Sequence, residues 1–408
     1  MTTFNATECF VWIWLPDKDK PVVAGKLETN GFYHDFFYGQ SYLANPNAIP
    51  LSKQELPLVK GKRFSSNNNI HQVIRDALPD SWGQRVLAQR YPTINLSVLD
   101  LLLLSSSDRI GALHFQSTAD EYQPHHENHA TLEQLLEGVN LIERGEVIPE
   151  NLMTALIHGT SIGGARPKAL IDDHKKKYVA KFTSSTDLYP IVQAEYACMW
   201  LAHKLSLNVA AVKLIKVKEK YVLLIERFDR EHATKGWLRK FMISGLTILG
   251  LEETEARFAS YLNLADQIRL TSSHPQEDLR ELFRRMVFNI LIGNTDDHAK
   301  NHSFFWNGHY YSLTPAYDLC PYPRSGQQAT QAMIVGEQGA YSQLSNALSG
   351  APRFGLSETE AKHEIERLVD GVKIYWPDAC AAAKLTTLQC KQFKGTAILN
   401  PYCFYDTP

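Results

Sequence analysis

The sequence lacks a surplus of charge of either sign, and it lacks a long hydrophobic run. Lys and Arg total 42 and Asp and Glu total 44, so the chain has no basic surplus of the kind that holds a protein to nucleic acid. The longest apolar run, Val98–Leu104, includes Asp100 and falls far short of the roughly 20 residues that span a bilayer. We therefore expect neither direct binding to DNA nor a membrane segment.

Clustered cysteines and a targeting signal are also missing. The six cysteines are scattered and include no Cys-x-x-Cys pair, which argues against a four-cysteine zinc site and against a disulfide scaffold. No Lys or Arg precedes Lys18, and the apolar run Val11–Leu15 stops at Pro16, whereas a signal peptide has a basic start and a longer apolar stretch. The sequence thus indicates a cytoplasmic protein with reduced thiols.

The composition is that of a globular protein with two or three domains. Of the 408 residues, 44% are hydrophobic and 21% are charged, which excludes a disordered or fibrous chain. Short apolar runs separated by turn residues predict strands in the first part, and helical periodicity dominates from Thr247 onward. We predict an α+β fold in three parts, which are residues 1–120, 130–228 and 229–408.

The middle of the chain predicts strands and one helix. Ala169–Ile171 and Tyr178–Phe182 are two predicted strands joined by a polar turn, and Tyr221–Ile225 is a third. Between them, Pro190 is predicted to open a helix that runs to about Leu205. Proline suits the first helical turn, because its missing N–H would have no acceptor there.

The most informative segment is a polar loop that follows a predicted buried helix. Apolar residues recur at helical spacing from Leu279 to Leu291, and Gly293 is expected to end the helix in the left-handed conformation. Beyond it, Asp296 and Asn301 have the spacing of a protein-kinase catalytic loop. In that loop the Asp accepts the proton of the substrate hydroxyl and the Asn binds magnesium.

A second carboxylate follows at Asp318, after a predicted strand at Tyr310–Leu313. Phosphoryl transfer needs a base beside the incoming hydroxyl and hard oxygen ligands for the metal ion beside the phosphates. Asp318 is predicted to supply such a ligand together with Asn301. A metal-hydrolase centre built from His298, His302 and the neighbouring carboxylates is an alternative, but Asn301 and Asp318 favour the kinase interpretation.

Lys181 lies in the middle of a predicted strand, between the apolar residues Ala180 and Phe182. A strand lysine in such a setting is costly unless its charge meets an anion, and nucleotide phosphates are one such anion. Glu195, on the following helix, is a further candidate partner. The alternative is an edge-strand lysine whose amine reaches solvent.

A small-residue loop, Ser161–Lys168, precedes these strands and contains Gly163 and Gly164 in succession. Glycines let the backbone approach a phosphate closely, and successive N–H groups can form an anion-binding concavity. Such a loop is more often a plain turn, but the nearby Lys181 favours the phosphate interpretation.

Together these segments resemble the HipA family of bacterial Ser/Thr kinases, the toxins of HipBA-type toxin–antitoxin pairs. Leu78-Pro79-Asp80 and Asp108–Leu113 resemble runs in the family's N-terminal subdomain, and Ser161–Leu170 resembles its phosphate-contacting loop. The resemblance covers most of the chain. It implies a bilobal, protein-kinase-like fold with a β-rich N-terminal lobe and a mainly helical C-terminal lobe.

The resemblance also implies a role for each matching residue. Lys181 matches the lysine that binds the ATP phosphates, and Asp296 matches the catalytic Asp. Asn301 and Asp318 match the magnesium ligands. The other carried-over roles are phosphate contact for Gly163, Gly164 and Lys168, adenine contact for Glu226 and Phe228, and inactivating autophosphorylation for Ser161.

The expected cofactors are therefore ATP and Mg²⁺, and the expected protein partner is a small helix-turn-helix antitoxin of the HipB type. DNA would be bound only through that antitoxin. The expected substrate is a protein of the translation machinery, such as an aminoacyl-tRNA synthetase, whose phosphorylation arrests growth. Two alternatives stay open: a small-molecule kinase of the aminoglycoside-phosphotransferase type, and a catalytically weak scaffold that binds the antitoxin.

Two departures from the family's pattern bear on these roles. Arg166-Pro167 stands where the best-known member has Gln-Glu, which leaves the contacts of the loop open. Asp297 follows the catalytic Asp where glycine is also found, so the charge beside the site can differ.

Overall fold

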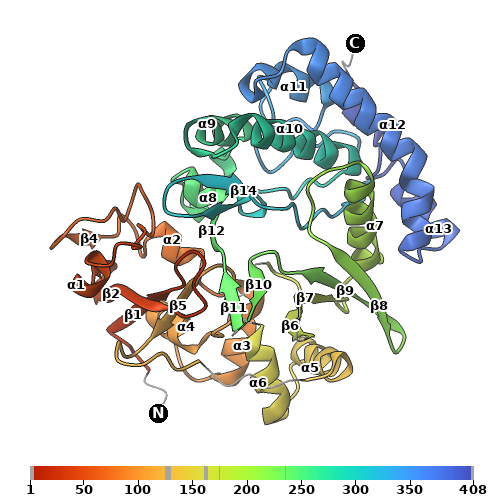
Figure 1. Ribbon diagram of the computed structural model, residues 1–408. Helices are drawn as coiled ribbons and strands as arrows, with labels where there is room; N and C mark the ends of the chain where they lie inside the picture. Colours follow the sequence, from red (N-terminus) through yellow and green to blue (C-terminus); the bar gives the residue numbers. More distant parts are fainter. Residues whose placement is uncertain (1–3, 125–129, 160–163, 174, 235, 406–408) are drawn as a thin grey trace. The chain divides into compact units, whose positions relative to one another are not determined.

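The computed structural model describes residues 4–124, 130–159, 164–173, 175–234 and 236–405 (Figure 1). The chain forms two compact units, and each is described by itself. Unit 1 comprises Met1–Ser185, Lys216–Ile243 and Trp306–His309, and unit 2 comprises Thr186–Ile215, Ser244–Phe305 and Tyr310–Pro408. The units divide the chain by packing, whereas the three predicted parts divide it by expected role, and those three ranges stay a prediction.

Unit 1 begins with a five-stranded antiparallel sheet. Its strands are β1 (Glu8–Ile13), β2 (Val22–Asn30), β3 (Tyr33–Tyr38), β4 (Arg63–Ser65) and β5 (Leu113–Gln116), in the order β4-β3-β2-β1-β5. One face of the sheet supplies core residues such as Val11, Phe36 and Phe115, which are fully buried. The helices of this part are α1 (Gln40–Leu43), α2 (Gln72–Arg75), α3 (Ser81–Arg90) and α4 (Val98–Leu104).

A second sheet carries the central strands that the sequence predicts. Its strands are β6 (Lys168–Asp172), β7 (Lys177–Phe182), β8 (Val212–Val217) and β9 (Lys220–Glu226), in the order β6-β7-β9-β8. Helices α5 (Leu132–Arg144) and α6 (Glu150–His158) pack against each other, and α6 also contacts β6 (Figure 1). The hairpin of β10 (Arg230–Ala233) and β11 (Gly236–Arg239) follows, and β12 (Phe241–Ser244) leads the chain into unit 2.

Unit 2 is mainly helical. Its longer helices are α7 (Ile191–Lys204), α9 (Tyr261–Thr271), α10 (Pro275–Ile292) and α12 (Glu358–Ala382). Its shorter elements are α8 (Gly245–Ile248), η1 (Glu253–Phe258), η2 (Ala299–Asn301), β13 (Ser303–Trp306), β14 (Tyr311–Leu313), α11 (Leu344–Ser349), η3 (Ala351–Phe354), α13 (Thr387–Phe393) and η4 (Pro401–Phe404). Helix α10 packs against α9 and α12, and α12 packs against α7. Sheets in unit 1 and helices in unit 2 agree with the predicted α+β class.

The helix before the candidate catalytic loop is confirmed. Every residue of the predicted apolar stripe of α10 is buried, from Leu279 to Leu291. Gly293 ends the helix with φ of 67°, in the left-handed region that glycine adopts without a steric penalty. Pro190 precedes the first residue of α7 and acts as its N-cap instead of lying in the first turn.

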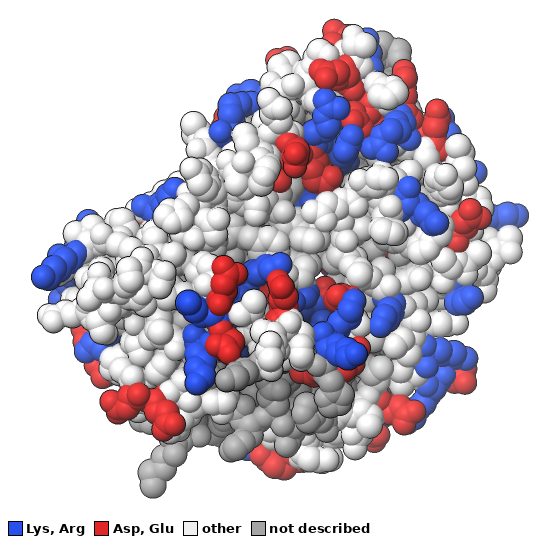
Figure 2. All heavy atoms as spheres, viewed as in Figure 1, with Lys and Arg blue, Asp and Glu red and all other residues white. Residues whose placement is uncertain are grey.

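The face shown in Figure 2 carries charges of both signs, and none of the described helices is suited to span a membrane. On the face shown in Figure 2, Lys and Arg side chains lie among Asp and Glu side chains. Across the described ranges, no helix combines the length and the hydropathy needed to cross a bilayer.

Candidate functional site

The loop after α10 presents one of its two adjacent carboxylates and buries the other. The Asp296 side chain is exposed, whereas Asp297 is only 2% exposed. The Asp297 carboxylate accepts hydrogen bonds from Asn289 Nδ2 (2.8 Å) and from the Tyr261 hydroxyl, and it lies 3.0 Å from His302 Nε2. Tyr261 lies on α9, Asn289 lies on α10, and His302 directly precedes β13. Because Asp297 is held by residues of three segments, it fixes the loop, and Asp296 faces outward.

The structure bears on the metal-hydrolase alternative, which was built from His298, His302 and the neighbouring carboxylates. His302 lies beside Asp297, with its Nε2 3.1 Å from Asp297 Oδ2. Within the described ranges no group of three or more His, Cys, Asp or Glu side chains is arranged to hold a metal ion.

Unit 2 brings the loop beside the segment that carries Asp318. Asn294 Nδ2 lies 3.3 Å from the main-chain oxygen of Asp318, and the Tyr317 hydroxyl donates to the main-chain oxygen of Lys300 (2.7 Å). The Tyr322 hydroxyl lies 3.4 Å from Asp296 Oδ2. These contacts tie the two segments together, so the candidate base and the candidate metal ligands belong to one region of unit 2.

The candidate magnesium ligands fit a hard cation by their chemistry. Asn301 offers a carboxamide oxygen and is 9% exposed, and Asp318 offers a partly exposed carboxylate. Asp318 adopts φ of 59°, a left-handed conformation that Asp tolerates better than most residues. A strained residue of this kind often lies at a functional site, where surrounding contacts hold it in place.

In unit 1, Lys181 and Lys168 are direct cross-strand partners in the register of β6 and β7. Lys181 is 8% exposed and Lys168 is 1% exposed. Strand β7 lies between β6 and β9, so the edge-strand alternative for Lys181 is wrong. Two buried ammonium groups on facing positions repel each other, and negative charge nearby would relieve this repulsion.

One such negative charge is Asp80. Its Oδ2 lies 3.1 Å from Lys168 Nζ, and its Oδ1 accepts from the Gly83 N–H (2.8 Å) at the start of α3. Burial raises the pKa of Asp80 more than the nearby Lys168 lowers it. The Trp82 indole donates to the main-chain oxygen of Lys168 (3.0 Å). Helix α3 therefore holds the point where the glycine loop ends and β6 begins.

The glycine loop itself is described only in part. Gly164 has φ of 113°, and a Cβ atom there would lie 2.5 Å from Lys168 Nζ. The positive φ therefore favours glycine, and a side chain here would also force the Lys168 amine, which Asp80 holds, to shift. Ser161 and Gly163 lie outside the described residues, and their predicted roles stay predictions.

The predicted adenine-contacting run lies at the end of β9. Glu226 is half-buried and pairs with Lys176 (2.6 Å), and Phe228 is half-buried. Arg227, between them, is fully enclosed and lies 2.8 Å from Asp229 and 3.1 Å from Asp108.

Arg227 belongs to a buried ionic cluster that sequence reasoning missed. Its members are Asp108, Lys177, Arg227, Asp229 and Arg230. Burial alone raises the pKa of Asp108, but Arg227, Arg230 and Lys177 lower it well below its usual range. Burial lowers the pKa of Arg230 to about 9, despite its two carboxylate neighbours.

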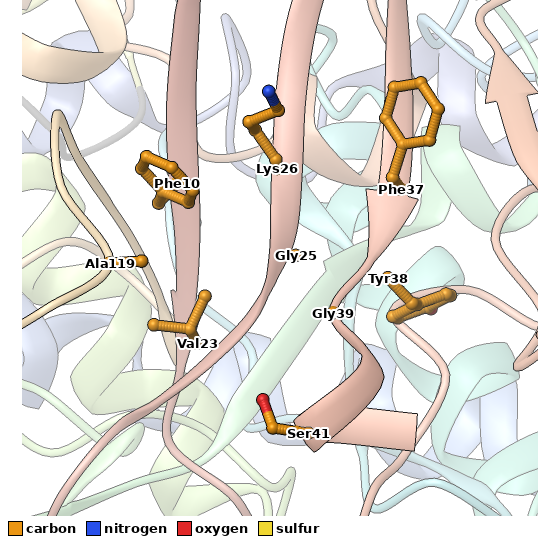
Figure 3. Close-up of a pocket in the computed structure, with 9 residues that line it drawn as sticks. All are labelled: Phe10, Val23, Gly25, Lys26, Phe37, Tyr38, Gly39, Ser41 and Ala119. Carbon is orange, nitrogen blue, oxygen red and sulfur yellow. The ribbon is translucent and has the colours of Figure 1, made fainter. Parts of the chain in front are cut away.

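A cavity lies on the five-stranded sheet of unit 1. It has a volume of about 320 Å³, and Phe10 and Phe37 flank Lys26 along its wall (Figure 3). Lys26 is already paired with Glu8 (3.2 Å) and Glu28. The cavity contains none of the candidate catalytic residues, so its size does not make it the candidate active site.

Comparison with known families identifies the chain. The HipA-like C-terminal domain family matches residues 160–376, which is more than half of the chain, and the HipA N-terminal domain family matches residues 13–116. The chain belongs to the HipA family. The C-terminal match includes the glycine loop, Lys181, Asp296, Asn301 and Asp318.

Two curated relatives and one solved structure describe the similarity. The Ser/Thr-protein kinase toxin HipA of Shewanella oneidensis is 28% identical over 183 residues, which cover 39% of this chain and 42% of the relative. Y4mE of Sinorhizobium fredii, named only provisionally as a kinase, is 25% identical over 307 residues, which cover 70% of this chain and 71% of the relative. The structure of HipA from S. oneidensis, solved with HipB and its operator DNA, matches with a TM-score of 0.71 at 19% identity and covers 96% of both chains.

The comparison confirms the predicted kinase-like α+β fold of the HipA type. Sequence reasoning missed three sets of interactions in this HipA-family chain. They are the contacts of Asp297, the Asp80–Lys168 pair and the buried ionic cluster. The family's motif runs do contain several of these residues, but no spacing rule pairs residues that lie so far apart along the chain. Glu195 is buried on α7 in unit 2, and its predicted pairing with Lys181 stays a prediction.

Proposed function

We propose that this HipA-family chain is a Mg²⁺- and ATP-dependent protein Ser/Thr kinase. The observation that carries the proposal is the loop in unit 2, where buried Asp297 fixes the backbone and exposed Asp296 precedes Asn301. The hydrogen bonds that link this loop to the Asp318 segment support a single phosphoryl-transfer region. Relatives named as kinases support the same class of activity.

In the proposed mechanism, Asp296 orients the hydroxyl of the target and accepts its proton. Its exposure suits a base that must meet the surface of another protein. Asn301 and Asp318 would hold Mg²⁺, which when bound neutralises the phosphate charge and leaves the γ-phosphoryl group open to attack. Asp297 keeps the loop in place through its buried hydrogen bonds, so that Asp296 does not need to reorganise during transfer.

The residues of unit 1 would bind the nucleotide. Lys181 would contact the triphosphate, and Lys168 faces Lys181 in the strand register while Asp80 pairs with the Lys168 amine. The backbone of Gly163 and Gly164 would cover the phosphates, since no side chain prevents close approach. Glu226 and Phe228 would contact adenine at the end of β9.

The family also suggests the biological role. We infer a cytoplasmic toxin that arrests growth by phosphorylating a component of translation, such as an aminoacyl-tRNA synthetase, and that a small helix-turn-helix antitoxin restrains. The solved S. oneidensis HipA is bound to HipB and its operator DNA, which supports a partner of that kind. Autophosphorylation of Ser161 would inactivate the chain, and mass spectrometry that finds Ser161 always unmodified in active preparations would contradict that role.

The central test is transfer of labelled phosphate from ATP into proteins of a cell lysate. Wild-type chain with Mg²⁺ should label protein bands, and Asp296→Asn should reduce the rate by roughly two or more powers of ten. Asp370→Asn, which makes the same change at an exposed site on α12, should leave the rate unchanged. Near-normal transfer by Asp296→Asn would contradict the proposed base.

The labelling assay and calorimetry test the two alternatives. Label that enters small metabolites instead of protein would favour a small-molecule kinase. If calorimetry detects no binding of Mg²⁺-ATP to the unphosphorylated chain, the scaffold interpretation becomes the better one.

A further inference from the structure

A second, smaller cavity lies in unit 2, directly against the candidate catalytic loop. Its volume is about 200 Å³, and it is lined by Leu246, Glu253, Ala256, His298, Ala299 and Lys300. Three of these residues stand between Asp296 and Asn301 in the sequence. The others come from α8 and η1, so two separate elements close the cavity against the loop.

We propose that this cavity binds a small aliphatic side chain of the protein substrate, close to the residue that receives the phosphate. The inference rests on the proposed kinase function and names a feature of its substrate. Because an extended chain advances about 3.3 Å per residue, His298 lies within roughly 7 Å of Asp296 along the loop. A substrate side chain within about three residues of the hydroxyl at Asp296 could therefore enter the cavity.

The size and the lining of the cavity favour this occupant. Sites for drug-sized ligands have volumes of roughly 300–1,000 Å³, so a cavity of about 200 Å³ suits one side chain better than a whole cofactor. Leu246 and Ala299 are buried and apolar. Glu253 and Lys300 pair with each other at exposed positions, so a charged side chain would have to compete with an existing ion pair.

The cavity is held in a fixed shape by close contact between α8 and the loop. The Gly245 N–H donates to the main-chain oxygen of His302 (2.6 Å). A Cβ atom on Gly245 would lie 2.7 Å from the Ala299 oxygen, so only glycine allows this approach. A preformed cavity loses little entropy when a side chain enters it.

His298 supplies a further reason to expect a bound group. It is one of the residues that line the cavity, and its buried Nδ1 has no hydrogen-bond partner among the described residues. Buried polar atoms are usually satisfied, and those that are not often belong to functional sites.

The test uses the full chain, Mg²⁺ with labelled ATP, and a Ser/Thr peptide library. In separate pools, Ala, Val, Leu, Asp or Lys is fixed at each position within about three residues of the phosphoacceptor. Wild type should prefer an aliphatic residue at one such position. Ala256→Leu fills the cavity and should lower kcat/KM for the preferred peptide roughly tenfold or more, chiefly through KM, and remove the preference.

Thr254→Leu is the matched control, since it adds an apolar side chain to the same short helix η1 at an exposed position outside the cavity lining. It should keep the wild-type preference, and the thermal unfolding of both variants shows whether they fold. Active wild type without an aliphatic preference, or Ala256→Leu with an unchanged preference, would overturn the inference while leaving the proposed kinase intact. If wild type phosphorylates no peptide and no lysate protein, the proposed function fails and the inference fails with it.

Discussion

Arg227 donates a hydrogen bond to the main-chain oxygen of Asp108 (3.0 Å) across 119 positions of sequence, and it lies 3.1 Å from the Asp108 carboxylate. Both residues are enclosed, at 4% and 2% exposed. Arg230 reaches the same carboxylate at 3.0 Å and Lys177 at 2.6 Å. The run that resembles the family's N-terminal subdomain and the run at the end of β9 are thus joined by a shared set of buried charges.

Removal of Asp108 should destabilise unit 1 severely. Asp108→Ala would leave three buried cations without this carboxylate, and breaking a buried ion pair from one side typically costs about 3–5 kcal/mol. Denaturant unfolding should show a loss of that size. Asp370→Ala, which removes an exposed pair with Lys373, should change stability by less than about 1 kcal/mol, and an equally small loss at Asp108 would contradict the role of the cluster.

Acid sensitivity of unit 1 should begin near neutral pH because of His71. Burial, with a smaller contribution from nearby His34, lowers the pKa of His71 to about 4, and its Nε2 lies 3.1 Å from the Phe64 oxygen. The folded state therefore binds fewer protons than the unfolded state between about pH 6.5 and 4. Stability from this residue is present above pH 6.5 and is lost as pH falls through that window, by at most about 3 kcal/mol.

The measurement is the free energy of unfolding as a function of pH. His71→Gln should flatten the slope between about pH 6.5 and 4, since glutamine does not titrate. Asp108 and Asp229 have lowered pKa values, so their stabilisation is lost only at lower pH, below about 4, and should persist in the variant. An unchanged slope in His71→Gln would assign the acid sensitivity to other groups.

The local pattern of apolar residues was sufficient to predict the helix and strands that carry the candidate site residues. The 3.6-residue spacing of apolar residues and the terminal Gly293 predict α10, and short apolar runs predict β7 and β9 with bounds within two residues of those observed. These features depend on neighbours in sequence. The loop that follows α10 has a family spacing, so its position too could be predicted.

Long-range charge pairing could not be predicted in the same way. Asp296 and Asp297 are adjacent and identical in type, and only the fold separates an exposed carboxylate from one enclosed by donors 36, 8 and 5 positions away. Likewise, Lys168 and Asp80 are 88 positions apart. Charged residues are usually exposed, so sequence alone gives no reason to bury these groups together.

The two adjacent aspartates of the loop should separate activity from stability. Asp297→Asn replaces an acceptor that holds three buried donors, so we expect a loss of about 1–3 kcal/mol in the free energy of unfolding together with a loss of activity. Asp296→Asn alters an exposed side chain and should change stability by less than about 0.5 kcal/mol. Paired unfolding and phosphoryl-transfer measurements on both variants check this.

Two outcomes would contradict the roles of Asp296 as base and Asp297 as the residue that holds the loop. A destabilised Asp296→Asn or a fully stable Asp297→Asn would mean that the two carboxylates have exchanged roles. Recovery of activity in Asp297→Asn at low temperature, where the folded population rises, would instead support a positioning role for Asp297.

A side chain at Gly164 should be destabilising, and a substitution at Gly31 separates the effect of positive φ from that of contact with Lys168. Gly164→Ala would impose φ of 113° on a residue with a Cβ and bring that atom against Lys168 Nζ, which Asp80 holds. We expect a loss of about 1–3 kcal/mol in unfolding free energy and a higher KM for Mg²⁺-ATP. Gly31→Ala, at φ of 67° with no heavy atom near its Cβ, tests positive φ alone and should cost about 1 kcal/mol with no change in KM.

The steric part of the Gly164 effect should depend on Lys168. In a Lys168→Met background the Asp80 ion pair and the Nζ atom are absent, and the shorter side chain can move aside, so Gly164→Ala should cost less there than in the wild-type background. A double-mutant cycle measures this difference as a coupling energy, which for contacting residues is typically about 0.5–3 kcal/mol. Simple additivity would show that the penalty at Gly164 comes from backbone conformation and not from contact with the lysine.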